Sequence, residues 1–257
     1  LIEIHTQSLP SARFALETVV FDLLAQASNK SLAEYLNPNF SSQIAVNGIE
    51  GLHFPSDGFK VIKIKVGFRN LFDEIENMEC LTQSYGENVQ FRLDLNAALD
   101  LPRAIRFCKE MEKFNIDYIE QPLAAENLDD LAELRYHTTI PIAVDESLTD
   151  YNSSEKIIGM QAADVFIIKP MISGGFSECK KIIEMAKLEN IRSVITTSLE
   201  TYIGRAACLH LAATNEILEP CGLATADLLT EDYSEIPIED GIVSLSKIPG
   251  LGISMQI

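Results

Sequence analysis

Strand-like apolar runs alternate with amphipathic helical stretches along most of this 257-residue chain. Strands separated by helices of this length are typical of βα units and of a parallel sheet. Seven or eight such units favour a closed barrel over an open doubly wound sheet, and no G-x-G-x-x-G motif follows the early strands. The strand-like runs are SQIAVNG (42–48), KVIKIKVG (60–67), VQFRLDLN (89–96), IDYIEQP (116–122), IPIAVDES (140–147), ADVFIIKP (163–170), IRSVITTS (191–198) and a short piece near EPCGL (219–223).

One charged residue stands at the C-terminal end of each of five consecutive predicted strands. Successive members are separated by 29, 26, 25 and 24 residues, which is one βα unit each time. The C-terminal ends of barrel strands meet at one rim, where barrel enzymes carry their catalytic groups. Unrelated surface charges would not keep this register five times in a row. The five residues are Lys65, Asp94, Glu120, Asp145 and Lys169.

Three carboxylates that converge from adjacent strands repel one another unless a positive charge lies between them. Oxygen ligands without a nearby His or Cys favour Mg²⁺, with Mn²⁺ possible, over zinc. Asn96 and Glu146 lie just beyond two of the proposed ligands and are expected to support them or a bound water. The alternative is that rim lysines hold the carboxylates in salt bridges. The proposed ligands are Asp94, Glu120 and Asp145.

Two lysines interrupt the otherwise apolar strand VIKIKVG (61–67). Because side chains alternate along a strand, Lys63 and Lys65 lie on the same face. Taken alone, this pattern is also that of an exposed strand with one solvated face, since lysine is rarely buried without a partner. The rim pattern favours the barrel mouth instead. There a metal and Lys63 would destabilise the ammonium form of Lys65 and allow it to act as a base.

The residue types at this rim indicate a class of reaction. A metal that binds a substrate carboxylate acidifies the adjacent C–H group, and it stabilises the enediolate formed when a lysine takes the proton. Lys65 and Lys169 face the proposed metal from opposite sides. We therefore expect abstraction of a proton α to the carboxylate of a small-molecule substrate.

The composition excludes several other classes of function. With 38 acidic and 20 basic residues the net charge is −18, and no Lys/Arg-rich run offers a nucleic-acid surface. We find no apolar run long enough to span a bilayer and no signal-peptide pattern at the start. The five cysteines form no CxxC pair and are expected to be buried or half-buried free thiols of a cytoplasmic protein, while the four histidines lack the spacing of a zinc site. The oligomeric state stays open.

Taken together, the motifs resemble the enolase superfamily in its muconate-lactonizing-enzyme branch, from about Ser11 to the end of the chain. The markers are the KxK of KIKVG, RLDLN, YIEQP, AVDES and IIKP. Within that branch, PSARFALET, IAVNG, IIKPMISGGF and ITTSLETYIG look most like o-succinylbenzoate synthase. The resemblance implies an α/β fold, a modified TIM-type (β/α)7β barrel with a capping domain. It also implies a carbon–oxygen lyase that dehydrates a cyclohexadiene carboxylate to o-succinylbenzoate in menaquinone biosynthesis.

The resemblance further implies roles for individual residues. Lys65 would remove the α-proton and then, as an acid, assist the departure of hydroxide as water. Lys169 would stabilise the ring or the enediolate through a cation–π contact. The three carboxylates would bind Mg²⁺. The SGG stretch before residue 176 is equally compatible with a tight turn. The residues expected to bind the succinyl carboxylate are Ser173, Gly174, Thr197 and Ser198.

The resemblance divides the chain into three segments. Residues 1–41 resemble the C-terminal helices of an α+β capping domain, most of which is absent from this sequence. Residues 42–235 correspond to the barrel, and residues 236–257 to a segment that returns toward the cap. The connection 48–60 is rich in Gly and Pro and barely long enough for a crossover helix, so this unit is expected to be abbreviated or incomplete.

Other functions would use the same residues. Racemisation or epimerisation of an N-acyl amino acid or a dipeptide would employ Lys65 and Lys169 as bases on opposite faces of the substrate. Dipeptide epimerases usually carry a DxD motif near the last strand, which GLATADLLTEDY (222–233) lacks. A Schiff-base lyase would use Lys169 covalently, which the three carboxylates disfavour. A non-catalytic barrel that binds metal is the alternative from another class.

Overall fold

The computed structural model describes residues 1–215, 217–229 and 236–253. All five cysteines fall in these ranges and are free thiols; four of them are buried, whereas Cys80 is exposed, against the expectation. No helix in the described part of the chain is long and apolar enough to cross a membrane. The chain forms two compact units: the strand unit, which comprises residues 47–167 and 186–193, and the terminal unit, which comprises residues 1–46, 168–185 and 194–257.

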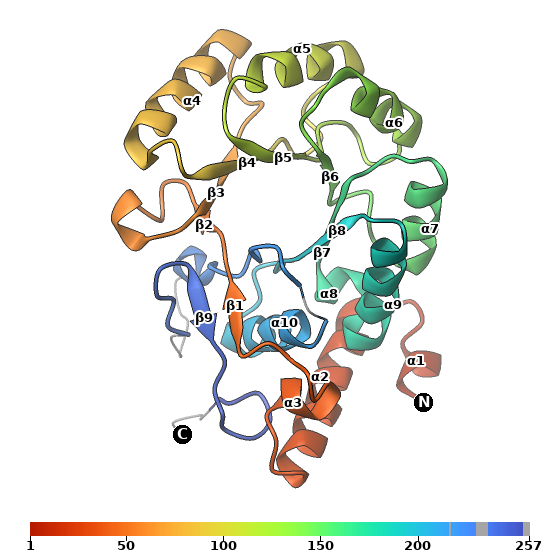
Figure 1. The fold of residues 1–257 in the computed structure, drawn as a ribbon. Helices are drawn as coiled ribbons and strands as arrows, with labels where there is room; N and C mark the ends of the chain where they lie inside the picture. The colour runs from red at the N-terminus through yellow and green to blue at the C-terminus, as the bar shows by residue number, and fades with distance from the viewer. Residues whose placement is uncertain (216, 230–235, 254–257) are drawn as a thin grey trace. The chain divides into compact units, whose positions relative to one another are not determined.

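Among the described residues, seven strands pair in the order β2-β3-β4-β5-β6-β7-β8, which is the order of the sequence (Figure 1). The pairs from β2 to β7 are parallel, so each connection must cross over from one end of the sheet to the other. The predicted α/β class built from βα units is therefore confirmed. The strands are β2 (Gly48–Ile49), β3 (Val61–Lys65), β4 (Gln90–Asp94), β5 (Ile116–Glu120), β6 (Ile142–Val144), β7 (Val165–Ile168) and β8 (Arg192–Ile195).

Helices connect the strands of the strand unit, and their starts follow from capping residues in the sequence. The side chains of Asn70, Asp100 and Asp150 accept hydrogen bonds from backbone N–H groups three residues later. Figure 1 shows α4, α5 and α6 on the same face of the strands, and α5 and α6 bury apolar residues such as Phe107 and Leu131. The helices are α4 (Leu71–Tyr85), α5 (Leu101–Met111), α6 (Leu128–His137) and α7 (Tyr151–Gly159).

The connection between β2 and β3 is short, and the sequence left open whether this unit is abbreviated or incomplete. Residues 50–60, all of them described, contain no α-helix and form a single 3-10 turn at Pro55–Asp57. The Tyr85 hydroxyl donates a hydrogen bond to the His53 carbonyl oxygen (2.5 Å), which fixes this loop to the end of α4. The loop therefore replaces a crossover helix.

The terminal unit contains helices and a two-stranded antiparallel sheet in which β1 (Gln43–Ala45) pairs with β9 (Ile242–Ser244). The prediction that residues 42–48 form one strand of the large sheet is wrong, because only the residues of β2 join that sheet. The predicted strand at 219–223 is reduced to isolated bridges. The helical segments are α1 (Ile2–His5), α2 (Pro10–Ala27), α3 (Leu32–Leu36), α8 (Pro170–Ser173), most of α9 (Gly175–Leu188), α10 (Tyr202–Thr214) and the 3-10 turn Ala226–Leu228.

The C-terminal segment packs on the first helices within the terminal unit. Leu32 N donates to Gly250 O (2.7 Å), and Leu251 N donates to the Asp22 carboxylate (2.7 Å). Gly250 has a φ of +75°, and a Cβ there would collide with the Asp22 carboxylate, so only glycine fits. The last residues of the segment expected to return toward the cap, 254–257, lie outside the described residues.

Candidate active site

Charged side chains gather at the C-terminal ends of β3, β4 and β5. The parallel register pairs Lys65 with Asp94 and Asp94 with Glu120, so the last residues of these three strands stand side by side. Asp94 is 1% exposed and Glu120 is 0% exposed. Buried carboxylates need a nearby positive charge or hydrogen-bond donors, and the lysines of β3 supply both.

Lys63 lies between two of these carboxylates. Its Nζ is 2.7 Å from Asp94 Oδ2 and 2.7 Å from Glu120 Oε1, and its side chain is 22% exposed. Burial lowers the pKa of Lys63, but the charges of Glu120 and Asp94 outweigh burial and hold the pKa above its ordinary value. Lys63 therefore remains an ammonium ion near neutral pH and acts as a fixed positive charge rather than as a base.

Lys65 is the more accessible of the two lysines, with a side chain that is 55% exposed. Its Nζ lies 2.6 Å from Asp94 Oδ2 and also donates to Asn96 Oδ1. Asn96 donates through Nδ2 to Glu146 Oε1 (2.9 Å), and its backbone N–H donates to Asp94 Oδ1 (3.1 Å). The two residues expected to support the ligands, Asn96 and Glu146, thus form a hydrogen-bonded chain that ends at Lys65.

Glu120 is a buried carboxylate whose charge is only partly compensated. Burial is the main reason that its pKa is raised to about 7; the charges of Asp94 and Asp145 add to the rise, and Lys63 opposes it. For Asp94, burial also raises the pKa, but Lys63 and Lys65 outweigh it and the net shift is downward. Glu120 Oε2 is buried and has no hydrogen-bond partner among the described residues. A cation bound at this oxygen would remove that penalty.

Gln121 fixes the backbone around the same strand ends, and the sequence interpretation did not single it out. Its Oε1 accepts hydrogen bonds from Asp145 N (3.0 Å) and Ser147 N (3.1 Å). Its Nε2 donates to Leu123 O (2.9 Å) and Ser147 Oγ (2.9 Å). The residue is 0% exposed and has a φ of +37°, which is uncommon outside glycine. Gln121 therefore ties the end of β6, where the buried Asp145 follows, to the end of β5.

The donor atoms of this cluster suit a hard divalent cation. The described residues contain no arrangement of three His, Cys, Asp or Glu side chains that already forms a metal site. The lysine contacts of Asp94 and Glu120 correspond instead to the salt-bridge alternative drawn from the sequence. The buried Glu120 Oε2 and the oxygen-only donors nevertheless fit Mg²⁺ or Mn²⁺.

Lys169 lies in the terminal unit, directly after β7, at the N-cap position of α8. Ser173 is the last residue of α8, and its buried Oγ has no hydrogen-bond partner among the described residues. Gly174 follows in the left-handed conformation, with a φ of +97°. Gly174 therefore forms the tight turn between α8 and α9, and substrate binding by Ser173 and Gly174 stays a prediction.

Thr197, Ser198 and Glu200 follow β8 in the same unit. The Thr197 hydroxyl is 3.1 Å from the Thr225 hydroxyl, and Ser198 N donates to Glu200 Oε2 (2.5 Å). Glu200 is 4% exposed, and neither its Oε1 nor the Ser198 Oγ has a hydrogen-bond partner among the described residues. Burial raises the pKa of Glu200, and the charge of Lys169 is among the influences that oppose the rise. The sequence interpretation did not include Glu200, which reads there as an ordinary acidic residue before a helix.

Residues 53–256 match the family model described as enolase C-terminal domain-like. That range includes every lysine, carboxylate and hydroxyl of the strand ends described above. The match extends over most of the chain and therefore includes both the strands of the large sheet from β3 onward and the residues at their C-terminal ends.

Named relatives fall into several activities. The N-succinyl-L-Arg/Lys racemase of Bacillus cereus is 24% identical over 96% of this chain, which spans 70% of that protein. The o-succinylbenzoate synthase of Thermobifida fusca is 32% identical over 71% of this chain and 57% of that protein. The crystal structure of a dipeptide epimerase from Enterococcus faecalis, complexed with Mg and the dipeptide L-Leu-L-Tyr, has a TM-score of 0.88 and 25% identity, and the match covers 98% of this chain and 75% of that one. The similarity thus establishes the family without selecting one substrate.

Proposed function

Because this chain belongs to the enolase C-terminal domain-like family, we propose that it removes a proton α to the carboxylate of a small-molecule substrate, with Lys65 as the base. The observation that carries the proposal is the cluster at the ends of β3, β4 and β5. There a 55% exposed lysine stands next to a carboxylate that is 1% exposed. Lys63 is enclosed by two carboxylates, so a substrate entering from solvent reaches Lys65 more readily.

Lys65 must be free of its proton before the reaction and must hold a proton after it. Once protonated, Lys65 would donate hydrogen bonds to Asp94 and Asn96, which are the contacts seen in this structure. Glu146 keeps Asn96 oriented for that contact.

We propose Asp94, Glu120 and Asp145 as the residues that hold Mg²⁺ or Mn²⁺. When bound, such an ion would orient the substrate carboxylate and stabilise the negative charge that develops on it. Support comes from Glu120 Oε2, which is buried without a hydrogen-bond partner among the described residues. Gln121 supports the same assignment because it fixes the backbone N–H of Asp145.

For the substrate we propose the cyclohexadiene carboxylate that loses water to form o-succinylbenzoate, in cytoplasmic menaquinone biosynthesis. The Thermobifida fusca relative supports this choice over the part of the chain that it matches. Lys65 would take the α-proton and then deliver it to the departing hydroxide, so that the C–O bond breaks and water leaves. Lys169 would stabilise the ring by a cation–π contact. The succinyl carboxylate would be bound by Ser173, Gly174, Thr197 and Ser198.

Racemisation of an N-acyl amino acid or a dipeptide is the second candidate. The Bacillus cereus racemase and the Enterococcus faecalis epimerase structure align with 96% and 98% of this chain. In that reaction Lys65 and Lys169 would act on opposite faces of one α-carbon, one removing the proton and the other returning it.

The test is turnover of the cyclohexadiene carboxylate with Mg²⁺, for the wild type, for Lys65→Ala and for the wild type with EDTA. Loss of o-succinylbenzoate formation in both controls would support the base, the metal and the substrate together. Exchange of the α-proton of an N-succinyl amino acid with solvent deuterium, without dehydration, would transfer the assignment to the racemase. Absence of both reactions, with metal still bound, would support the non-catalytic barrel.

A further inference from the structure

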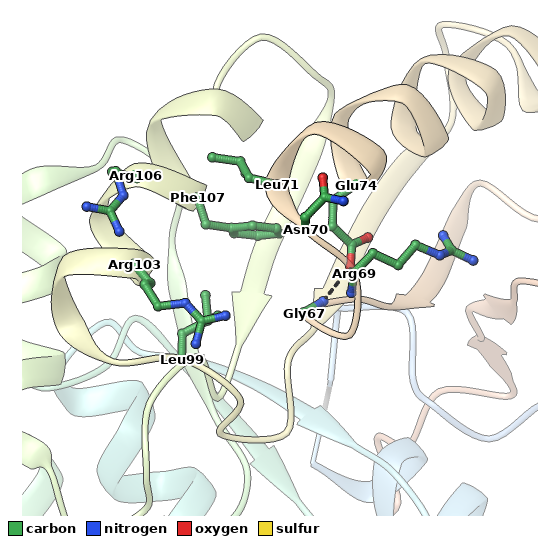
Figure 2. Close-up of a pocket in the computed structure, with 9 residues that line it drawn as sticks. All are labelled: Gly67, Arg69, Asn70, Leu71, Glu74, Leu99, Arg103, Arg106 and Phe107. Atoms are coloured by element: carbon green, nitrogen blue, oxygen red, sulfur yellow. Dashed lines mark hydrogen bonds between the residues drawn. The ribbon is translucent and has the colours of Figure 1, made fainter.

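Glu74 is a buried carboxylate that the proposed reaction does not use. It lies in the first turn of α4 and is 2% exposed. Its Oε1 accepts hydrogen bonds from Gly67 N (2.8 Å) and Arg69 N (3.2 Å), as Figure 2 shows for Gly67. Its Oε2 is buried and has no hydrogen-bond partner among the described residues. Burial of a carboxylate with one unpaired oxygen is unfavourable. The burial of Glu74 therefore needs an explanation, and the two hydrogen bonds accepted by Oε1 suggest one.

Both N–H groups belong to the turn that follows β3. Gly67 has a φ of +91°, and a Cβ at this position would lie 2.9 Å from Leu95 Cδ2. One residue earlier, Val66 N donates to Asp94 O (3.0 Å) and continues the pairing with β4. The turn is therefore packed against β4 on one side and bound by Glu74 on the other.

This turn begins directly after the proposed base. Lys65 is the last residue of β3 and stands two residues before Gly67. Because its long side chain is 55% exposed, packing around the side chain does not by itself determine where Nζ lies. The position of the backbone then decides which points Nζ can reach. A misplacement of about 1 Å at the reacting atoms can reduce a rate by about 10²-fold.

We propose that Glu74 is a positioning residue for Lys65. Its carboxylate accepts hydrogen bonds from the backbone N–H groups of Gly67 and Arg69 and so fixes the turn after β3. The fixed turn holds the end of β3 in place and thereby limits the positions that Lys65 Nζ can occupy. The inference relies on the proposed function only for the identification of Lys65 as the base.

A ligand site is the other explanation that the surroundings of Glu74 suggest. Glu74 lines a small pocket of about 110 Å³ to which Arg69, Arg103 and Arg106 also contribute. Figure 2 shows Arg69 and Arg106 extending in opposite directions, so these two arginines do not converge on one bound anion. The hydrogen bonds from Gly67 N and Arg69 N to Glu74 are therefore the contacts of Glu74 that bear on the proposed reaction.

The test compares Glu74→Asp, Glu74→Ala and Glu74→Gln with Glu76→Ala, an exposed position on the same helix. Aspartate is one methylene shorter and would not reach both N–H groups, whereas the amide oxygen of glutamine still accepts them. We expect the Asp and Ala variants to lower kcat at least about tenfold, with KM changed less than about threefold. The Gln variant should keep most of the activity, and Glu76→Ala should match the wild type.

A second readout does not depend on turnover. Hydrogen exchange at the Gly67 and Arg69 amides and the ¹⁵N signal of Lys65 Nζ are measured in the same variants by NMR. We expect faster exchange and an altered Lys65 signal in Glu74→Asp but not in Glu76→Ala. A folded Glu74→Asp variant with wild-type kcat and wild-type amide protection would overturn the inference. If the wild type turns over neither substrate, the proposed function fails, while the exchange and Lys65 data still decide whether Glu74 positions the turn and the lysine.

Discussion

Lys63 Nζ lies 2.7 Å from Glu120 Oε1, and the two side chains are 22% and 1% exposed. An ion pair this far removed from water is only as favourable as its geometry, because both charges have lost their hydration. The same ammonium group also contacts Asp94, so one cation compensates two buried anions. Loss of Lys63 would therefore leave more uncompensated charge than loss of an ordinary surface lysine.

The variant Lys63→Met tests this arrangement through stability. Methionine fills a similar volume but leaves Asp94 and Glu120 without their shared cation. We expect the free energy of unfolding to fall by about 2–4 kcal/mol at neutral pH, measured by urea denaturation. Lys113→Met is the matched control, since Lys113 pairs with Glu79 where both side chains are about half exposed, and it should change little. Equal denaturation midpoints for the two variants would contradict the account.

Metal affinity tests the assignment of Glu120. Glu120→Gln preserves the shape of the side chain but removes the charge and one ligand oxygen. We expect Mn²⁺ and Mg²⁺ to bind at least about tenfold more weakly, as measured by titration calorimetry of the purified protein. Glu110→Gln, on an exposed face of α5, should bind both ions as the wild type does. Unchanged affinity in Glu120→Gln would exclude this carboxylate as a ligand.

Gln121→Leu should be strongly destabilising, although it exchanges a polar side chain for an apolar one in a buried position. The change leaves the N–H groups of Asp145 and Ser147 without their acceptor. We expect a loss of about 2–4 kcal/mol in the free energy of unfolding, together with weaker Mn²⁺ binding. Gln161→Leu serves as the control because Gln161 also has a positive φ (+53°) but is exposed. A similar loss in both variants would mean that backbone conformation, not hydrogen bonding, is responsible.

His210 predicts an acid-dependent loss of stability in the terminal unit. Its Nδ1 accepts from Ala33 N (3.1 Å), and Nε2 lies 3.2 Å from Leu251 O. Burial lowers the pKa of His210 to about 4 from an ordinary value of 6.5, against the opposing effects of the Leu251 carbonyl and Asp22. The unfolded chain therefore binds a proton at this histidine below pH 6.5, whereas the folded protein does so only near pH 4.

The free energy of unfolding should accordingly fall as the pH decreases from about 6.5 to about 4, by about 3 kcal/mol from this residue. Above pH 6.5 the histidine should contribute no slope. Urea denaturation across this range checks the prediction, with His210→Gln expected to flatten the profile. His137→Gln, at an exposed helix end, should leave the profile unchanged. If the free energy of unfolding of His210→Gln still falls between pH 6.5 and pH 4 as it does in the wild type, groups other than His210 are responsible for the pH dependence.

The sequence predicted the positions of the strand ends because a regular spacing has a simple geometric consequence. Each βα unit returns the chain to the same edge of the sheet, so residues one unit apart become neighbours. Lys65, Asp94 and Glu120 follow this rule and stand in consecutive strands in register. No side-chain detail is needed for that inference.

Side-chain partners were harder to predict. The alternation of side chains along β3 placed Lys63 on the same face as Lys65. Alternation does not predict, however, that the Lys63 side chain extends so that its Nζ contacts both Asp94 and Glu120. Gln121 escaped notice because an amide carries no charge and gives no motif of its own. Its importance arises from four hydrogen bonds that form only after β5 and β6 are adjacent.

The stretch 42–48 was misjudged for a different reason. Its apolar alternation predicts a strand correctly, but the sequence around it does not reveal which strand it will pair with. The partner of Ile44 is Val243, about two hundred residues further along the chain. Local pattern therefore gave the conformation, and a distant segment decided the sheet.

That distant pairing has a consequence for how the protein is made. Residues 47–167 of the strand unit are continuous and form contacts between neighbouring βα units, which can begin while the chain is still being synthesised. The terminal unit draws on three separate stretches, and its β1 cannot meet β9 until Ile242–Ser244 have left the ribosome. The entropy of closing so long a loop delays this step further. The strand β1 therefore reaches its native partner later than the neighbouring strands of the strand unit reach theirs.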